Sequence, residues 1–572
     1  MHLLEQALLW LDADRARFWT VAWLAFGAMA AAAFFPPGPD APPAIRRWNA
    51  VLFGLGIFAV LAAFRWPVWF YPRDLNPDEA QIVAGAITLD RFPVYWKYVD
   101  GTTHGPWCEY LVLAAHWLGA PFNYVTARIV GTLLQAGALL AAWGTLRCFT
   151  SERAARVGIL PALAFWGFVS WDDFVHYATE LPSVFFLAVS GWLAARVLRA
   201  PAPGRWHLLL AGLAGLALGA TPFAKLQSVP AGLGLALVVL ALLWRGRADL
   251  PAAQRWRLGS AFVAGGLLPA LALLVFLGVY GLWEHFRASY LLSALDYVAL
   301  SDHRPAEMPM RFLNFSATEP AFAWLFYGAL GFALLYARTA ATPALRAARA
   351  VAWLLLGVTL YGVLRPGREV AHYLHFLVIP LTLLAGLTLA IALEESGAAG
   401  RTRWRQRLPY VWFAGLLLVP QAYTRVNGNW NRFAGFVAEY RREPLSPAAD
   451  FIRQRAQAGD TLAMWGWEPH LLVETGLPHG TREAHTANQI MDWPLRPYYV
   501  TRYLWDMERR QPDWFVDVVG PGSFAFEARE IQGHETVPAL RDLIAKHYEL
   551  VAEFGSKRIY RRKDAPAGPI KL

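Results

Sequence analysis

The sequence predicts a polytopic α-helical membrane protein of about twelve transmembrane helices, followed by an external C-terminal α/β domain. Hydrophobic residues make up 56% of the 572-residue chain and charged residues only 16%, with a mean hydropathy of +0.31. Soluble domains carry about 25% charged residues. Apolar runs of spanning length recur as far as residue 424, and beyond it charges, prolines and tryptophans become more frequent. These three observations together predict the fold class.

The predicted spans are apolar runs, some of which need their flanking residues to cross about 30 Å of hydrocarbon. In chain order they are residues 18–35, 48–64, 124–146, 157–170, 181–198, 206–220, 226–244, 258–282, 321–335, 350–363, 373–393 and 408–423. The apolar segment 107–119 is only about a dozen residues long and carries Glu109 and His116. We therefore predict that it is an interfacial helix.

The charges of the loops give the predicted orientation. Arginine-rich loops alternate with loops of other composition, and they are found at residues 46–47, 147–156, 196–205, 245–257, 338–349 and 401–407. The positive-inside rule makes this side cytoplasmic. The excess of 52 Lys and Arg over 42 Asp and Glu then belongs to cytoplasmic loops and does not indicate a nucleic-acid partner. Nearly all the unusual polar residues fall on the opposite, external side.

Two domains are predicted. Residues 1–424 form the membrane domain, which includes a first external loop at 69–106 and the interfacial helix at 107–119. Residues 445–563 form a small external α/β domain. Its predicted elements are strands at 461–467 and 514–519, a hairpin at 548–554 and 558–561, and helices at 447–456 and 537–548. Trp465, Trp467 and Glu468 are candidates to contact a sugar, although a core role for the tryptophans is favoured.

The most informative motif is the segment 76–81, Asn-Pro-Asp-Glu-Ala-Gln, which opens the first external loop. Its adjacent carboxylates, Asp78 and Glu79, lie close to the membrane, where charged groups lose hydration and are commonly functional. One interpretation is a catalytic or metal-binding carboxylate at the mouth of a cavity. The other is a helix start, with Asn76 as N-cap, Pro77 at the first position and both acids near the positive end of the helix dipole. The two interpretations are compatible.

Other polar residues on the external side extend this candidate site. His104 follows a Gly/Pro-containing turn on the same loop as Asp78. The segment 171–182 carries three acids and a histidine, which suit a divalent cation or a solvated loop: Asp172, Asp173, His176 and Glu180. The last two are four residues apart, so we predict that they share one helical face.

Cations on the external side suggest an anionic ligand. Lys225 stands alone among apolar residues after Pro222, and it either reaches the interface or serves a phosphate. Arg365, Arg368 and His372 run against the positive-inside bias beside Tyr373. They suit a phosphate or pyrophosphate, or alternatively anionic headgroups.

The chain carries no Walker pattern and no Gly-rich strand–turn–helix. The energy for a reaction must then come from the substrate, which suggests a pre-activated lipid phosphate. A secondary transporter is the alternative from another class, but it predicts repeated halves with broken helices, and no such repeat is seen. A catalytically inactive relative that binds lipid is the third reading.

Segment 76–81 resembles the first-loop acidic motif of the GT-C superfamily of membrane glycosyltransferases. This superfamily includes protein O-mannosyltransferases, the lipid A aminoarabinose transferase and bacterial glycosyltransferase-39-like proteins. Residues 104–107 resemble the group's His/Lys-Pro-Pro-Leu element, with Gly105 in place of the first proline and Trp107 in place of the leucine. Segments 222–225 and 366–373 also look like elements of its bacterial members. The resemblance covers about residues 48 to 423, and the order and spacing of these short motifs carry it.

The resemblance implies an inverting transferase of EC class 2.4 that moves a hexosyl or pentosyl group from a polyprenyl phosphate to a glycan, lipid or protein acceptor. It implies that Asp78 is the general base, with Glu79 orienting Asp78 or the acceptor. The residues implied to contact the donor phosphate are His104, Lys225, Arg365, Arg368, His372 and Tyr373. Some relatives require a divalent cation and others do not, so metal dependence stays open. The implied location is the bacterial inner membrane, with the active site and the C-terminal domain on the periplasmic side.

Overall fold

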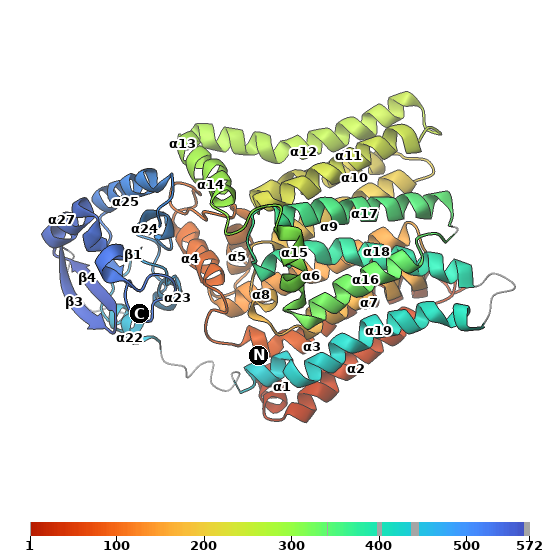
Figure 1. The fold of residues 1–572 in the computed structure, drawn as a ribbon, viewed down its shortest axis with the longest axis horizontal. Coiled ribbons are helices and arrows are strands. Elements are labelled where there is room, and N and C mark those ends of the chain that lie inside the picture. Colours follow the sequence, from red (N-terminus) through yellow and green to blue (C-terminus); the bar gives the residue numbers. More distant parts are fainter. Residues whose placement is uncertain (1, 340, 397–402, 436–444, 565–572) are drawn as a thin grey trace. The chain divides into compact units, whose positions relative to one another are not determined.

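A computed structural model describes residues 2–339, 341–396, 403–435 and 445–564 (Figure 1). By contact, the chain divides into two units. Unit 1 comprises Met1–Phe70, Gly131–Phe276 and Ser301–Ala438, and unit 2 comprises Tyr71–Val130, Leu277–Leu300 and Glu439–Leu572. The predicted domains 1–424 and 445–563 remain predictions about position relative to the membrane. By packing, the first external loop belongs with the C-terminal residues.

Unit 1 is built from long helices. They are α1 (His2–Asp12), α2 (Arg15–Phe34), α3 (Pro43–Trp69), most of α6 (Tyr124–Arg147), α7 (Glu152–Phe168), α9 (Leu181–Arg199), α10 (Arg205–Ala220), α11 (Val229–Ala241), most of α12 (Ala252–Tyr280), α16 (Pro320–Leu335), α17 (Pro343–Leu364), α18 (His375–Ser396) and α19 (Arg403–Asn427). Shorter helices connect them, namely α8 (Asp172–Val175), η1 (Thr221–Phe223), η2 (Leu226–Ser228), η3 (Leu242–Gly246), α15 (Met308–Ala317), η5 (Ala371–Leu374) and α20 (Asn429–Phe433).

Each of the twelve predicted apolar runs consists mostly of helical residues. Within the described residues, nine helices are long and apolar enough to cross a membrane, and α15 and α16 form a pair bent by 120° that would make ten. The predicted number of about twelve is higher because α7 has only 17 residues and α16 only 16, while α19 is polar at both ends. The chain is therefore a polytopic membrane protein. The segment predicted to be an interfacial helix forms α5 (Trp107–Trp117), which at 11 residues is too short to span.

Small residues allow the helices of unit 1 to approach closely. A Cβ on Gly215 of α10 would overlap the carbonyl oxygen of Phe262 in α12, and one on Gly265 would overlap the carbonyl oxygen of Gly212. Lipid-embedded helices have no hydrophobic driving force between them, so close backbone contact of this kind is a main source of their association.

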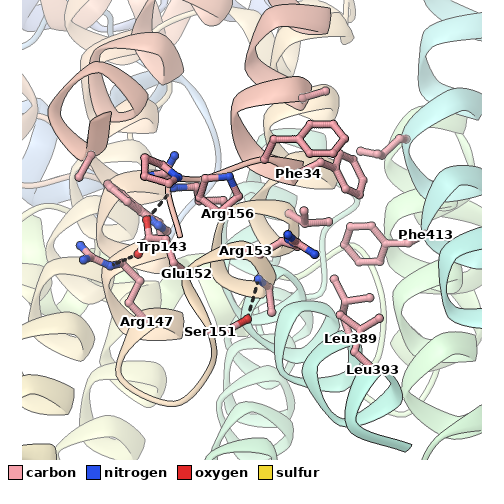
Figure 2. A pocket seen from close by; sticks show the side chains of 18 of the residues that line it. Phe34, Trp143, Arg147, Ser151, Glu152, Arg153, Arg156, Leu389, Leu393 and Phe413 are labelled. Carbon is pink, nitrogen blue, oxygen red and sulfur yellow. Dashed lines mark hydrogen bonds and ion pairs between the residues drawn. The ribbon is translucent and has the colours of Figure 1, made fainter. Parts of the chain in front are cut away.

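One end of unit 1 encloses a cavity of about 1680 Å³ between α2, α3, α7, α18 and α19 (Figure 2). Its lining combines aromatic and aliphatic side chains with several arginines, among them Arg147, Arg153 and Arg156.

Unit 2 contains a four-stranded sheet of order β1-β2-β4-β3, which confirms the predicted strands and hairpin. The strands are β1 (Leu462–Trp465), β2 (Trp514–Asp517), β3 (Tyr548–Phe554) and β4 (Lys557–Arg562). β1 and β2 pair in parallel, with Met464 opposite Val516, and β4 runs antiparallel to both β2 and β3. Gly555 has a φ of +60° in the hairpin turn, a conformation that glycine adopts at no steric cost.

Helices cover both faces of this sheet. They are α22 (Pro447–Arg453), α23 (His470–Thr475), α24 (Ala487–Ile490), α25 (Arg496–Arg510), α26 (Arg529–Gln532), η6 (His534–Thr536) and α27 (Pro538–His547), and unit 2 also holds α4 (Pro77–Arg91), α5, α13 (Trp283–Phe286), η4 (Arg287–Leu292) and α14 (Ser293–Ala299). One core joins Met464 and Val516 to Leu471, and it includes Ala84 of α4. The other joins Trp465 to Tyr503, so Trp465 has the favoured core role.

Candidate functional site

The acidic pair lies on the first turn of α4, as the sequence predicts. Asn76 is the N-cap in an extended conformation (φ −151°, ψ 137°), and its side-chain oxygen accepts a hydrogen bond of 3.0 Å from the Asp78 backbone N–H. Pro77 follows at the start of the helix, where its missing N–H costs nothing. Both carboxylates therefore sit at the positive end of the helix dipole.

Glu79 is fully buried and committed to an ion pair with Arg128. The Arg128 guanidinium donates from Nε to Oε1 at 3.0 Å and from Nη2 to Oε2 at 2.7 Å. The same guanidinium also donates to the carbonyl oxygens of Tyr71 and Arg73. Arg128 on α6 thus fastens both the loop before α4 and the first turn of α4. This bidentate geometry is the strongest form of a carboxylate–arginine contact.

Asp78 has a different environment. Its side chain is half-buried, and the described residues offer its carboxylate no hydrogen bond. His485 lies within electrostatic range in the same unit: burial lowers the pKa of His485 to about 4, and the negative charge of Asp78 opposes that shift. The Trp467 ring stacks on the His485 ring with centroids 4.3 Å apart. A neutral imidazole therefore lies near a carboxyl group that accepts no hydrogen bond from the described residues.

His104 is buried and paired with Glu109 of α5, with Nε2 and Oε1 2.7 Å apart. The Tyr95 hydroxyl donates to the same carboxylate at 3.4 Å. A Cβ on Gly101 would overlap both the Tyr95 and His104 side chains, so only glycine fits this turn. His104, predicted to contact the donor phosphate, is thus held by a carboxylate within unit 2.

The first loop is tied to the C-terminal residues by buried charges. Asp100 lies 2.6 Å from the Arg502 guanidinium of α25, which also pairs with Glu483 at 2.6 Å. The Asp100 backbone N–H donates to the carbonyl oxygen of Arg482, and the His479 N–H donates to Thr88 Oγ1, both at 2.9 Å. The surroundings of the α4 carboxylates therefore include residues from both ends of the sequence.

A second polar cluster belongs to unit 1. Lys225, which lies between the 3₁₀ helices η1 and η2, is buried. Its Nζ lies 3.0 Å from Glu180 Oε1 and donates to Thr179 Oγ1 at 2.7 Å. Nζ also lies 5.5 Å from the centre of the Tyr373 ring. Burial alone would raise the pKa of Glu180, but Lys225 and His372 outweigh it and lower this pKa to about 2.

His372 connects the acidic residues of this cluster. Its imidazole lies 3.5 Å from Asp173 and 4.0 Å from Glu180, and its ring centre is 5.6 Å from that of His176. His176 and Glu180 do meet near His372, but not on one helical face, so that expectation is wrong. α8 ends at Val175, His176 is extended (φ −73°, ψ 172°), and a new helix begins only at Leu181.

The remaining predicted site residues of unit 1 form other ion pairs or are exposed. Arg368 pairs with Asp302 at 3.3 Å, and Arg365 is exposed at the C-terminal end of α17. Asp172 pairs with Arg432 at 2.7 Å. The contacts within each unit thus join Lys225, Glu180, His372, Tyr373 and Asp173 in unit 1, while Asp78, Glu79 and His104 belong to unit 2.

Sequence reasoning missed several buried arginines that organise these sites. Arg128 lies within the predicted span 124–146. Arg65 of α3 directly follows the predicted span 48–64 and donates to the carbonyl oxygens of Trp166, Phe174 and Val175 at 2.8 to 3.4 Å. A charged residue in or beside an apolar run is costly and usually has a partner, so both positions carried a usable signal. Arg502 lies in a polar helix and gave no such signal.

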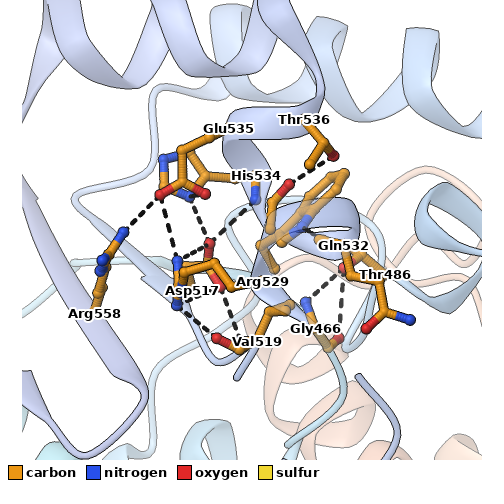
Figure 3. Close-up of polar contacts among 12 residues, drawn as sticks. Gly466, Thr486, Asp517, Val519, Arg529, Gln532, His534, Glu535, Thr536 and Arg558 are labelled. Atoms are coloured by element: carbon orange, nitrogen blue, oxygen red, sulfur yellow. Dashed lines mark hydrogen bonds and ion pairs between the residues drawn. The ribbon is translucent and has the colours of Figure 1, made fainter. Parts of the chain in front are cut away.

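One group of potential metal ligands is found among the described residues, and it contains none of the predicted site residues. Asp517, His534 and Glu535 bring their ligand atoms within 4.8 Å of one another (Figure 3). Arg529 lies 3.0 Å from Asp517, and Arg558 lies 2.7 Å from Glu535. Two guanidinium groups already neutralise these carboxylates. The group therefore serves as an ion-pair network that joins β2 to α26 and β4.

The helical bundle with its small sheet has the fold of a solved membrane protein. That structure is ArnT from Cupriavidus metallidurans bound to undecaprenyl phosphate. The TM-score is 0.57 at 14% identity, and the match covers 91% of this chain and 99% of ArnT. At this identity the likeness is one of fold.

Other matches have lower TM-scores. ArnT from the same organism in the apo state gives 0.49 at 16% identity, covering 91% of this chain and 100% of ArnT. The Archaeoglobus fulgidus oligosaccharyltransferase in complex with Zn and sulfate gives 0.46 at 13% identity, covering 82% of this chain and 67% of that protein. No family model matches the chain. No curated protein sequence matches it either.

Proposed function

We propose that this protein is an inverting glycosyltransferase that moves a hexosyl or pentosyl group from a polyprenyl phosphate to an acceptor on the external face of the membrane. The shared fold with ArnT, which was solved with undecaprenyl phosphate bound, supports a lipid phosphate as donor carrier. The acceptor class is a glycan, lipid or protein hydroxyl or amine. The proposed location is a bacterial inner membrane, with the transfer on the periplasmic side.

The unequal environments of the two α4 carboxylates carry the proposal. Glu79 is buried and neutralised by Arg128, whereas Asp78 is half-buried and accepts no hydrogen bond from the described residues. A general base must reach the proton that it removes. Only Asp78 meets that requirement, so we assign the base to Asp78 and a positioning role to Glu79.

The proposed reaction is a single displacement. Asp78 accepts the proton of the acceptor hydroxyl or amine as the acceptor attacks the anomeric carbon. The bond from that carbon to the carrier phosphate oxygen breaks, its electron pair stays on the phosphate, and the configuration inverts. The departing phosphate is proposed to contact Lys225, Arg365, Arg368, His372 and Tyr373. The cations among these residues would offset the negative charge that develops on the phosphate.

Replacement of Asp78 by asparagine tests the proposal. Asp78→Asn keeps the size of the side chain and removes the base, so donor turnover should fall by about two to four orders of magnitude. Asp90→Asn is the matched control, since Asp90 is an exposed aspartate on the same helix. The assay follows release of undecaprenyl phosphate from undecaprenyl-phosphate-linked hexoses and pentoses by purified protein in nanodiscs, with membrane extract as acceptor. Near-normal turnover by Asp78→Asn would reduce Asp78 to a residue of the helix start.

A further inference from the structure

The cavity at one end of unit 1 lies far from the polar cluster around Lys225. Helix α18 begins at His375, three residues after His372, and its residues Leu389 and Leu393 line the cavity. They lie 14 and 18 residues along the helix, about 21 to 27 Å at 1.5 Å per residue. The arginine-rich loops at this end are the ones that the positive-inside rule makes cytoplasmic. This cavity is thus distinct from the proposed donor-phosphate residues.

The lining is amphipathic. Aromatic and aliphatic side chains form one part, including Phe26, Phe413 and Leu389. At about 1680 Å³, the cavity exceeds the roughly 300–1,000 Å³ of typical small-molecule pockets. Tyr410 and Leu418 also line it and are more than half exposed. The apolar part is therefore continuous with the surface of a helix that faces lipid.

The charged part of the lining is strongly basic. It holds five arginines and a single acidic residue, Glu152. Glu152 pairs with Arg147 and with the buried Arg156, each at 2.6 Å. Arg156 also donates to Asn49 Oδ1 at 2.7 Å, and the Trp143 ring lies between the two guanidinium groups at 5.0 and 5.6 Å. The carboxylate of Glu152 is therefore neutralised by two of the five arginines.

The other three arginines are Arg46, Arg47 and Arg153. Their side chains are exposed, and they form no ion pair with the side chains that the structure describes. Figure 2 shows Arg153 directed toward the side of the cavity that holds Phe413 and Leu389. A positive charge next to an apolar surface matches a ligand with an anionic group and a hydrocarbon tail.

We propose that this cavity binds an anionic phospholipid of the cytoplasmic leaflet. Its phosphate would lie at Arg47 and Arg153, and its acyl chains would follow the apolar lining toward Tyr410 and Leu418. The cytoplasmic leaflet is rich in anionic lipids, and basic pockets between membrane helices on that side bind their headgroups. The five arginines complement the headgroup, and the exposed apolar lining gives the chains a path to the bilayer.

The test measures lipid binding by the full-length protein in detergent, using native mass spectrometry. The probes are phosphatidylglycerol and phosphatidylcholine with identical acyl chains, and glycerol 3-phosphate as the headgroup phosphate without chains. The variant is Arg47→Gln/Arg153→Gln. The matched control is Arg257→Gln/Arg346→Gln, which removes two exposed arginines of the same predicted side that do not line the cavity.

Wild-type protein should bind phosphatidylglycerol at least tenfold more tightly than phosphatidylcholine. The cavity variant should lose about fivefold in affinity per arginine, while the control keeps the wild-type affinity. Gly27→Trp tests the apolar part, because a Cβ on Gly27 meets nothing within 4 Å and the indole would fill the cavity. It should lower phosphatidylglycerol binding without a change in charge. Equal binding of the two lipids, equal loss in the control, or full displacement by glycerol 3-phosphate would overturn the proposal.

Discussion

Glu79→Gln is the substitution that best separates the structural from the catalytic role within the acidic pair. The side chain keeps its volume but loses the charge that faces the buried Arg128. Glu79 is fully buried, receives two hydrogen bonds from Arg128, and lies 3.4 Å from the Leu75 backbone N–H. The variant therefore leaves a buried guanidinium without its counter-charge, while the two backbone carbonyls that accept from Arg128 remain.

Breaking one partner of a buried ion pair costs about 3–5 kcal/mol. Glutamine still offers one acceptor, so we expect about 3 kcal/mol, the lower end of that range. For a unit of this size, 1 kcal/mol shifts the melting temperature by about 2–4 °C. The expected decrease in the melting temperature of unit 2 is then about 6–12 °C.

The two free cysteines allow this to be measured in one unit. Cys108 on α5 is buried in unit 2, and Cys148 is in unit 1. In a Cys148→Ser background, a thiol-reactive dye reports the temperature at which Cys108 becomes accessible. Asp78→Asn is the matched control, because it removes a neighbouring carboxylate that has no such partner. Its cost should stay within about 1 kcal/mol, the size of a helix-dipole interaction.

Unchanged dye accessibility in Glu79→Gln, or the same shift in both variants, would refute the assignment of separate roles. A second variant tests whether the loss of stability comes from the unpaired Arg128 or from any change at position 79. Glu79→Leu/Arg128→Met removes both charges, and such replacements of a buried pair are often neutral. It should recover most of the melting temperature that Glu79→Gln loses.

Three further predictions concern other buried charges. Arg502→Leu leaves two carboxylates without their guanidinium, each 2.6 Å away in the wild type. It should lower the Cys-reported melting temperature of unit 2 by about as much as Glu79→Gln, with the exposed Arg509→Leu as control. Burial lowers the pKa of His485 to about 4 from its ordinary 6.5. As the pH falls, the folded state therefore becomes protonated at His485 at a lower pH than the unfolded state. Stability is then full above pH 6.5 and falls as the pH drops toward 4, and melting temperatures across that interval should fall less in His485→Gln. Lys225→Met removes the cation that pairs with Glu180 and should lower thermal stability. The double variant Lys225→Met/Glu180→Leu should restore thermal stability but not undecaprenyl phosphate binding. Recovery of both would show that Lys225 has only a structural role.

Features that depend on neighbouring residues were predictable from the sequence. Hydrophobic length identified the helices, two short runs separated by a turn identified the hairpin, and the Asn76–Pro77 pair identified the start of α4. In each case the signal and the structure occupy the same few residues, so no long-range contact decides the outcome.

The pairing of buried charged residues was not predictable from the sequence. Glu79 and Arg128 are 49 residues apart, and Asp100 pairs with an arginine near the end of the chain. Which buried charges meet depends on how the helices pack, and the local sequence carries only the cost of leaving them unpaired. The error at His176 and Glu180 has a related cause. A spacing of four residues implies a shared face only if the helix is continuous, and here it ends at Val175.

Helix geometry explains why two adjacent carboxylates can differ so much. At 3.6 residues per turn, consecutive side chains point about 100° apart, so Asp78 and Glu79 cannot face the same surroundings once α4 forms. Ile82, Val83 and Ala86 share the face of Glu79 and are fully buried, which fixes the rotation of the helix about its axis. With that rotation set, Glu79 turns inward to Arg128 and Asp78 is left without a hydrogen bond from the described residues. The pair therefore combines an anchor and a reactive group within a single turn, and exchanging the two residues should abolish both roles.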